Sequence, residues 1–246
     1  MITKNVITLA LLFVVMLTGS SSKLNAAKFH NPSISYLYGE NFVVEPDTQQ
    51  TLTLEYAAAW EYIDLFMFAE KKFYSGSGNG TGRYGEFSPR VKLYDFEQGS
   101  LLKKLTLATT FERGKNGVKS NLVGFGLDFN STYFNYLTSN VYHRDAPDTA
   151  GHGWQLTSTW SLSTEVAELP ILIDGYLDWV FISDESEANF HFNPQIKIDM
   201  KKWLGGNHQW YVGLEYDYWH EKYGIDNSEN FDTNQNTASL LLKYHF

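Results

Sequence analysis

The sequence predicts an all-β fold, a transmembrane antiparallel up-and-down β-barrel of about 12 strands. Three observations support this prediction. Apolar and polar residues alternate along most of the chain, aromatic residues mark the ends of the apolar faces, and the last segment is an alternating strand that ends in Phe246. Because successive side chains of a strand point to opposite sides of the sheet, each segment has one apolar and one polar face. Membrane barrels turn the apolar face outward.

Composition narrows the class of protein further. The chain has 246 residues and no Cys, with 19% charged and 16% aromatic residues and a formal net charge of -9. This balance is not typical of intrinsic disorder. The lack of Cys excludes a disulfide framework, a Cys-ligated zinc site and a thiol nucleophile. The acidic balance argues against binding to nucleic acid, which requires a basic surface.

Residues 1–27 have the pattern of a signal peptide. Lys4 precedes an uninterrupted apolar run from Val6 to Leu17, and small residues lead to Ala26 and Ala27, where cleavage is expected. The run is shorter than the roughly 20 apolar residues that span a bilayer, so a membrane anchor is disfavoured. We therefore expect export through this signal peptide, with residues 28–246 forming the barrel in the outer membrane of a Gram-negative cell.

The strand pattern is clearest between Thr51 and Tyr62. There the even-numbered positions are apolar or aromatic and the odd-numbered positions are mostly polar. The pattern recurs along the chain, although the faces of 133–143 and the register of 64–72 are ambiguous. About 12 such segments begin near residues 33, 49, 64, 84, 101, 120, 133, 153, 169, 188, 208 and 237.

Short and long connections alternate in this pattern. Long connections are expected at 74–82, 144–151 and 222–235, and short ones near 63, 98, 131, 166 and 206. Alternation alone does not exclude a soluble sandwich or a lipocalin-type barrel, whose apolar faces point inward. Charged polar faces, aromatic strand ends and the terminal Phe246 favour the membrane barrel. A terminal Phe also resembles the signal that the barrel-assembly machinery recognises.

In a membrane barrel the polar faces line a lumen, and twelve strands leave a narrow pore. Its inward residues are mixed in charge and lean acidic, which argues against an anion-selective pore. Aromatic rings beside carboxylates suit a neutral ligand with a flat heterocycle and hydroxyl groups, because the ring stacks and the donors bind carboxylates. The plainer alternative is that inward charges pair with one another and the rings only narrow the lumen. The candidate pore-lining, substrate-binding residues are Glu55, Asp64, Phe66, Phe68, Glu70, Glu86, Arg90, Asp174, Asp178, Glu215, Asp217 and Trp219.

Several stretches resemble the Tsx-type nucleoside-specific outer-membrane channels, and most of all their OmpK-type branch. The resemblance rests on Leu54–Tyr56, Asp64–Glu70, the Glu-Phe-Ser-Pro-Arg element at Glu86–Arg90, Tyr218–His220 and Tyr244–Phe246. It implies a monomeric twelve-stranded barrel with a narrow pore and passive uptake of nucleosides.

The resemblance also implies that the bases stack on pore aromatics beside ionisable groups, and that surface loops serve as phage or colicin receptors. Phe66 and Phe68 stand where the nucleoside-specific branch is expected to have tyrosines. The OmpK-type branch is named mostly as a surface antigen and phage receptor. A general small-solute pore and a receptor barrel without nucleoside selectivity therefore remain alternatives.

An enzyme is not expected. Outer-membrane phospholipases also form twelve-stranded barrels, but no Ser lies two residues after His143, His152 or His220, and a Ser nucleophile needs a base within hydrogen-bond reach. His191 and His245 have no neighbouring ligand at a useful spacing, so no metal site and no cofactor are predicted.

Overall fold

The computed structural model describes residues 27–147, 150–205 and 209–246. The predicted signal peptide, apart from Ala27, lies outside the described residues. The strands are β1 (Phe29–Gly39), β2 (Thr48–Ala59), β3 (Ile63–Ser75), β4 (Gly80–Asp95), β5 (Leu102–Gly114), β6 (Lys119–Phe129), β7 (Tyr136–Ala146), β8 (Gly151–Val166), β9 (Leu169–Ser183), β10 (Asn189–Asp199), β11 (Gln209–His220) and β12 (Gln235–His245).

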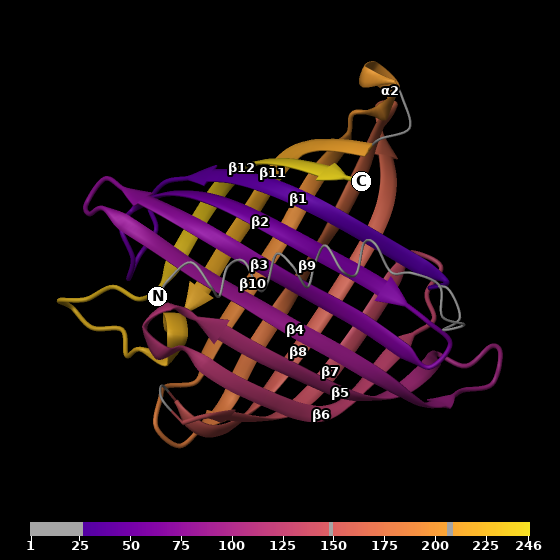
Figure 1. Cartoon of the computed structure of the whole chain (residues 1–246), viewed down its shortest axis with the longest axis horizontal. Coiled ribbons are helices and arrows are strands. Elements are labelled where there is room, and N and C mark those ends of the chain that lie inside the picture. The colour runs from indigo at the N-terminus through magenta and orange to yellow at the C-terminus, as the bar shows by residue number, and fades with distance from the viewer. Residues whose placement is uncertain (1–26, 148–149, 206–208) are drawn as a thin grey trace, which may run out of the picture.

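Each strand pairs antiparallel with its neighbours in sequence, and β1 pairs with β12 to close the barrel (Figure 1). The predicted up-and-down barrel of twelve strands is therefore confirmed. Closure pairs every strand on both edges, which removes the unpaired edge that lipid cannot solvate. No helix in the described ranges is long and apolar enough to cross a bilayer.

The barrel has two differently built ends. The terminal rim holds the start of β1, the end of β12, the connections 60–62, 96–101, 130–135 and 167–168, and residues 200–205, which contain α2 (Lys201–Leu204). The loop rim holds the connections 40–47, 76–79, 115–118, 184–188 and 221–234, with η1 (Lys115–Gly117) and η2 (Lys222–Gly224), and residues 147 and 150 between β7 and β8. In Figure 1 the loop rim lies at the left and α2 marks the terminal rim at the upper right.

Connection lengths alternate less than the sequence pattern predicted. The Gly-rich segment at 74–82 is a hairpin, since Lys72 pairs with Gly82 and Tyr74 pairs with Gly80, leaving only 76–79 as the turn. Arg144 likewise belongs to β7, where it faces Gly153 of β8. These segments pair because backbone groups extend the ladder wherever no Pro interrupts it, whatever the side chains.

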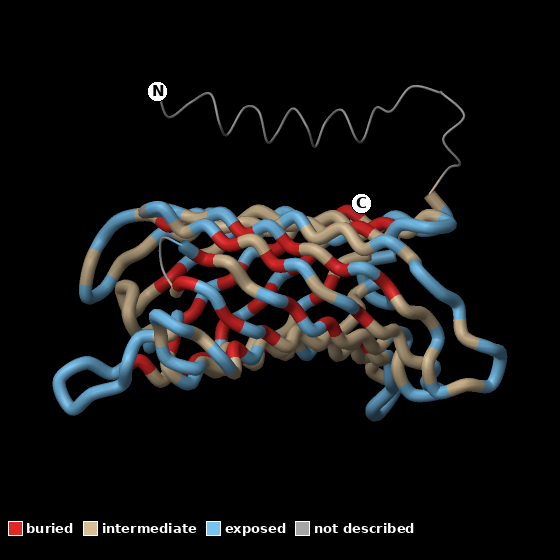
Figure 2. The backbone as a smooth tube through the Cα atoms, turned by 90° about the horizontal axis from the view of Figure 1, so that it is seen from below, coloured by how far each residue is buried: buried red, intermediate tan, exposed pale blue. Residues whose placement is uncertain are grey.

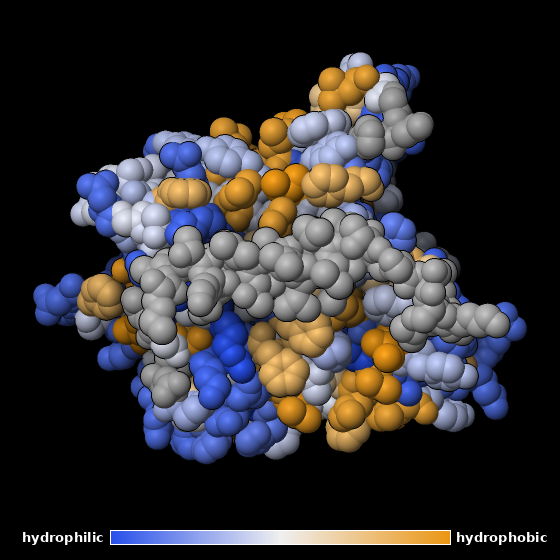
Figure 3. Space-filling model, viewed as in Figure 1, coloured by the Kyte–Doolittle hydropathy of each residue, from blue (hydrophilic) through white to orange (hydrophobic). Residues whose placement is uncertain are grey.

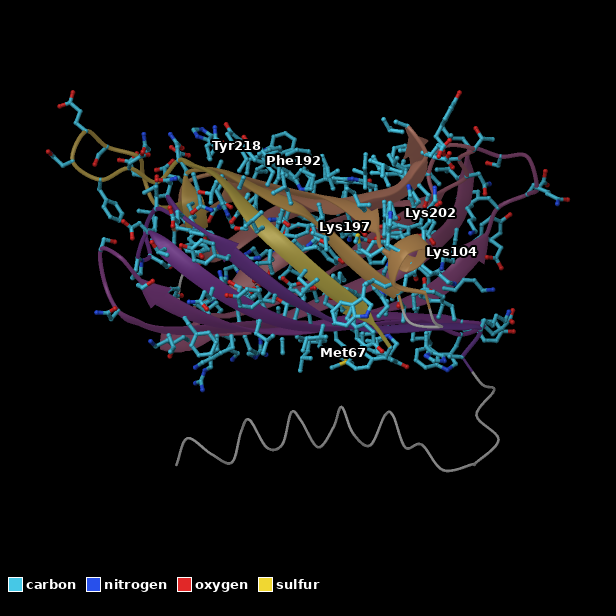
Figure 4. The ribbon with its side chains drawn as sticks, turned by 90° about the horizontal axis from the view of Figure 1, so that it is seen from above. Met67, Lys104, Phe192, Lys197, Lys202 and Tyr218 are labelled. Atoms are coloured by element: carbon cyan, nitrogen blue, oxygen red, sulfur yellow. The ribbon has the colours of Figure 1, made fainter. Side chains whose placement is uncertain are left out.

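Apolar side chains cover the outside of the barrel. Leu52 and Leu54 are exposed, whereas Lys197 is fully buried although it is charged. Buried and exposed residues alternate along the strands (Figure 2), and hydrophobic residues gather across the middle of the visible outer face, between hydrophilic ends (Figure 3). In Figure 4, Phe192 and Tyr218 lie at the margin of the barrel and Lys197 lies within its outline. The polar faces therefore point into the lumen.

Continued alternation after Arg90 and Lys92 predicts that Tyr94 faces inward, but Tyr94 faces outward. A β-bulge between Lys92 and Tyr94 shifts the β4–β5 register, so that Tyr94 pairs with Leu105 on the apolar face and Asp95 pairs with Lys104 on the polar face. A bulge inserts one extra residue, which reverses the alternation beyond it. The simple period-two pattern cannot register that change.

Candidate pore-lining site

An aromatic strip lines the inner wall of β3 and β4. The ring centroids of Phe66 and Phe68 are 5.9 Å apart, and those of Phe68 and Tyr84 are 5.7 Å apart. Strand register places Phe68 between Glu55 of β2 and Glu86 of β4. Phe66 keeps 40% exposure although it faces inward. Water therefore reaches this part of the lumen, and the strip presents ring faces to it.

Two acids and two bases form a cluster near the terminal rim, in which each base contacts both acids. Arg90 Nη2 lies 2.5 Å from Asp128 Oδ1, and its Nη1 lies 3.8 Å from Asp64 Oδ2. Lys104 bridges the same two carboxylates, bonding Asp64 and lying 3.1 Å from Asp128 Oδ2. Because β3, β4, β5 and β6 each contribute one charge, the cluster ties four strands together on the inner face and is balanced within itself.

A second ion pair lies on the inner wall of β5 and β7. Arg144 donates to both carboxylate oxygens of Glu112, at 2.9 and 2.8 Å, and also to Gln155 and Ser120. The sequence pattern predicted a connection at 144–151, so it did not indicate Arg144 as a second inward Arg. The alternation of β7 that would have revealed it was ambiguous, because Tyr136 and Tyr142 also face inward.

On the opposite wall, His191 stacks on Trp219 with ring centroids 3.7 Å apart and an interplanar angle of 15°. Its Nε2 lies 2.7 Å from Asp217 Oδ1, and its Nδ1 lies 3.3 Å from the Tyr176 hydroxyl. Gln235 donates to the other oxygen of Asp217 at 2.7 Å. Asp217 is thus held on both sides, and Trp219 is covered by the imidazole on one face.

Three more of the predicted acids, Asp174, Glu55 and Glu70, have amine partners. Lys197 donates to both oxygens of Asp174 at 2.6 and 2.7 Å, while Lys243 bonds Glu55, which also accepts from Ser33 at 3.1 Å. Glu70 lies 3.2 Å from Lys72. Much of the acidic lumen is therefore neutralised by neighbours, as the plainer interpretation expected for individual residues.

Three predicted carboxylates are different. Within the described part of the chain, no Lys, Arg or His nitrogen lies within 4.0 Å of Glu86, Asp178 or Glu215. Glu86 accepts from the Tyr84 hydroxyl at 2.8 Å, Asp178 from Thr157 at 2.5 Å and Gln155 at 3.1 Å, and Glu215 from Gln195 at 2.8 Å. None of these three carboxyl groups is therefore held in an ion pair.

All twelve candidate residues lie on the inner face, on β2, β3, β4, β9 and β11. The structure divides them into an aromatic strip, a balanced rim cluster, paired acids, unpaired acids and Trp219, which stacks on His191. The sequence could not separate these groups. Among the described residues, no group of three or more His, Asp or Glu side chains is arranged to bind a metal ion.

Comparison with known proteins defines the fold. No protein-family model and no curated protein matches the chain. Among solved structures, the KdgM porin in complex with disordered oligogalacturonate is 13% identical, with a TM-score of 0.50, covering 87% of this chain and 99% of that chain. The outer-membrane protein Omp33 of Acinetobacter baumannii is 8% identical, with a TM-score of 0.43, covering 89% and 98%. The chain has the fold of outer-membrane β-barrel porins. At sequence identities this low, the similarity establishes the fold and nothing about the solute.

Proposed function

We propose that this chain forms a channel for small solutes in the outer membrane, and that its lumen favours nucleosides. The observation that supports nucleosides is the aromatic strip of Phe66, Phe68 and Tyr84, which two carboxylates border. A base that stacks on such a ring gains about 1–3 kcal/mol per base. Its exocyclic amines and sugar hydroxyls can donate to Glu86, which no cation neutralises.

The rim cluster also suits a neutral solute. Nucleosides are neutral, and the cluster, which lies between the strip and the terminal rim, is balanced between two acids and two bases. A neutral solute passes such a cluster without the Coulomb penalty that a single-sign constriction imposes on like-charged ions. A general small-solute pore would share the barrel and this cluster, but it would make no use of the strip.

Uptake by liposomes containing the purified protein tests this proposal. Adenosine and thymidine should enter faster than glucose. Phe66→Ala and Phe68→Ala should weaken nucleoside binding by roughly 5- to 150-fold, the equivalent of 1–3 kcal/mol. Phe87→Ala is the matched control, since Phe87 lies on β4 but is exposed on the outer face and contacts Phe111. Equal rates for all three solutes, or unchanged uptake by both strip variants, would reduce the proposal to a general pore.

A second candidate function is a surface receptor for a phage or colicin. The β11–β12 connection projects from the loop rim (Figure 1), where Ser228 and Phe231 form an isolated bridge and Phe231 is exposed. Deleting 226–232 should abolish adsorption and keep conductance if this hairpin is the receptor. Unchanged adsorption would exclude it.

The proposal includes the route to the membrane. Residues 1–27 would direct export, and the barrel would act as a monomer surrounded by outer-membrane lipids. The exposed Phe246, whose ring packs against Tyr244 at 5.0 Å, would be read by the barrel-assembly machinery. Removal of Phe246 should then slow assembly in cells but leave refolding in detergent unchanged.

A further inference from the structure

Two connections of the loop rim meet over the lumen. Lys222 begins η2 but is only 2% exposed. Its ammonium makes three hydrogen bonds, to Val43 O at 3.2 Å, to Glu45 Oε2 at 2.7 Å and to Gln235 Oε1 at 2.7 Å. An ammonium has three donors, so all of its capacity is used.

Tyr223 adds a second contact between the same two connections. Its hydroxyl donates to Glu45 Oε1 at 2.6 Å, so that the two oxygens of one carboxylate hold two consecutive residues of η2. The Tyr223 ring lies 5.2 Å from Trp219, on the inner face of β11. We call Val43, Glu45, Lys222 and Tyr223 the mouth latch.

The latch belongs to a run of contacts that joins three connections along one side of the mouth. On one side, Glu187 of the β9–β10 connection donates its backbone N–H to Gly224 O at 3.0 Å. On the other side, Glu45 belongs to the β1–β2 connection. Since β10, β11, β12, β1 and β2 are consecutive around the barrel, η2 lies across the inner edge of this arc.

Backbone strain marks the same two connections. Asn41, Val44, Glu221 and Tyr223 have φ of 67°, 73°, 51° and 63°, in the left-handed region. A β-branched residue such as Val44 is rare there, because its side chain makes this conformation strained. Such conformations persist only where surrounding contacts compensate. For Tyr223, one such contact is the hydrogen bond from its hydroxyl to Glu45, so this conformation depends in part on the latch.

We propose that the mouth latch is a gate, which Glu45 holds closed over the loop-rim mouth of the proposed channel. This proposal rests on the channel function, because it assigns regulation to that same lumen. Gln235 joins the gate to the lumen wall, since it accepts from Lys222 and donates to Asp217. A solute that binds beside Trp219 and Asp217 lies directly beneath the latch.

Single-channel recording in planar bilayers tests the gate. Glu45→Gln leaves a buried ammonium without its carboxylate, so Lys222 should turn outward to water and the ratio of open to closed dwell time should rise roughly thirtyfold or more. Tyr223→Phe removes one bond without creating an unpaired charge and should raise the ratio less. Glu40→Gln is the matched control, because Glu40 lies in the same connection but bonds Tyr38 on the outer face.

A cross-link gives the opposite perturbation. The chain has no Cys, so Glu45→Cys with Tyr223→Cys introduces the only two thiols, which a short bismaleimide can join. The joined protein should stay in its low-conductance state, and the unjoined double variant should resemble Glu45→Gln. Heat-modifiable mobility on gels reports whether each variant forms a barrel. If Glu45→Gln does not fold, Tyr223→Phe and the cross-link decide.

The outcomes separate the gate from the channel. Wild-type dwell times in Glu45→Gln and Tyr223→Phe, with nucleoside selectivity intact, would overturn the gate and leave the proposed function standing. A protein that carries no current in any variant would overturn both. Opening in Glu40→Gln as well would show that any lost charge in this connection has the same effect, which would also overturn the assignment to Glu45.

Discussion

The unpaired carboxylates predict that the pore prefers cations, although its lumen also contains many amines. Lys197, Lys243 and Lys104 are each bound to acids, so their charge is offset locally. Glu86, Asp178 and Glu215 have hydroxyl or amide donors instead. These donors orient a carboxylate without cancelling its charge. The triple variant Glu86→Gln, Asp178→Asn, Glu215→Gln should therefore lose most of the preference.

Coulomb's law sets the size of this effect. A monovalent ion 4 Å from one carboxylate gains about 1 kcal/mol in a water-like dielectric, and an anion loses as much. One kcal/mol corresponds to about a fivefold change in occupancy. Each carboxylate can therefore raise the occupancy of the pore by cations up to about fivefold and lower its occupancy by anions by the same factor. Screening weakens the effect as ionic strength rises, because the Debye length is about 10 Å at 0.1 M.

The assay is the zero-current potential across a KCl gradient in planar bilayers at pH 8. The zero-current potential of the wild type should have the sign expected for preferential permeation of K⁺. The potential of the triple variant should be closer to zero. Asp145→Asn is the control, since Asp145 pairs with His152 on the outer face. Two results would contradict the reasoning: anion selectivity of the wild type, or a triple variant whose zero-current potential equals that of the wild type. Either result would show that ion pairing does not determine which lumen charges act on permeating ions.

Other perturbations test the faces, the pairs and the gate separately. Leu54→Lys should impair assembly, because a Lys that faces lipid near the midplane costs about 2–4 kcal/mol; efficient refolding into vesicles would contradict the outward assignment. Arg144→Met should lower the unfolding free energy by about 3–5 kcal/mol by leaving Glu112 unpaired, measured by urea titration in detergent against Arg144→Met/Glu112→Met, which should recover part of the loss. Gly124→Val should prevent closure between β6 and β7, since a Cβ there would collide with the backbone of the adjacent strand; a normal folded yield would refute this. Burial opposes ionisation of Glu45, but Lys222 and Lys72 hold the pKa of that carboxyl below its usual 4.5, so the latch should persist down to that pH and open only in stronger acid, while opening already at pH 6 would contradict it.

The local part of the prediction was accurate because strand geometry is local. Alternation of side chains depends only on the extended backbone, so the inner face of Glu55 and Trp219 follows from the alternation of apolar and polar residues around them. The same rule failed at Tyr94, where a bulge reverses the faces. Bulges depend on how two strands fit together, and one strand's pattern contains no record of that fit.

What the sequence by itself determined is the set of strands, their inward and outward faces, and the acidic and aromatic character of the lumen. Only the tertiary structure decided which charges meet. Lys104 bonds Asp64 from two strands away, and Lys222, expected in an exposed loop, is buried against Glu45 from the far end of the chain. The first contact depends on the relative stagger of β3, β4 and β5, and the second depends on the closure of β1 with β12, which brings the two connections together. Residues that lie more than a hundred positions apart become neighbours only when the ring of strands closes.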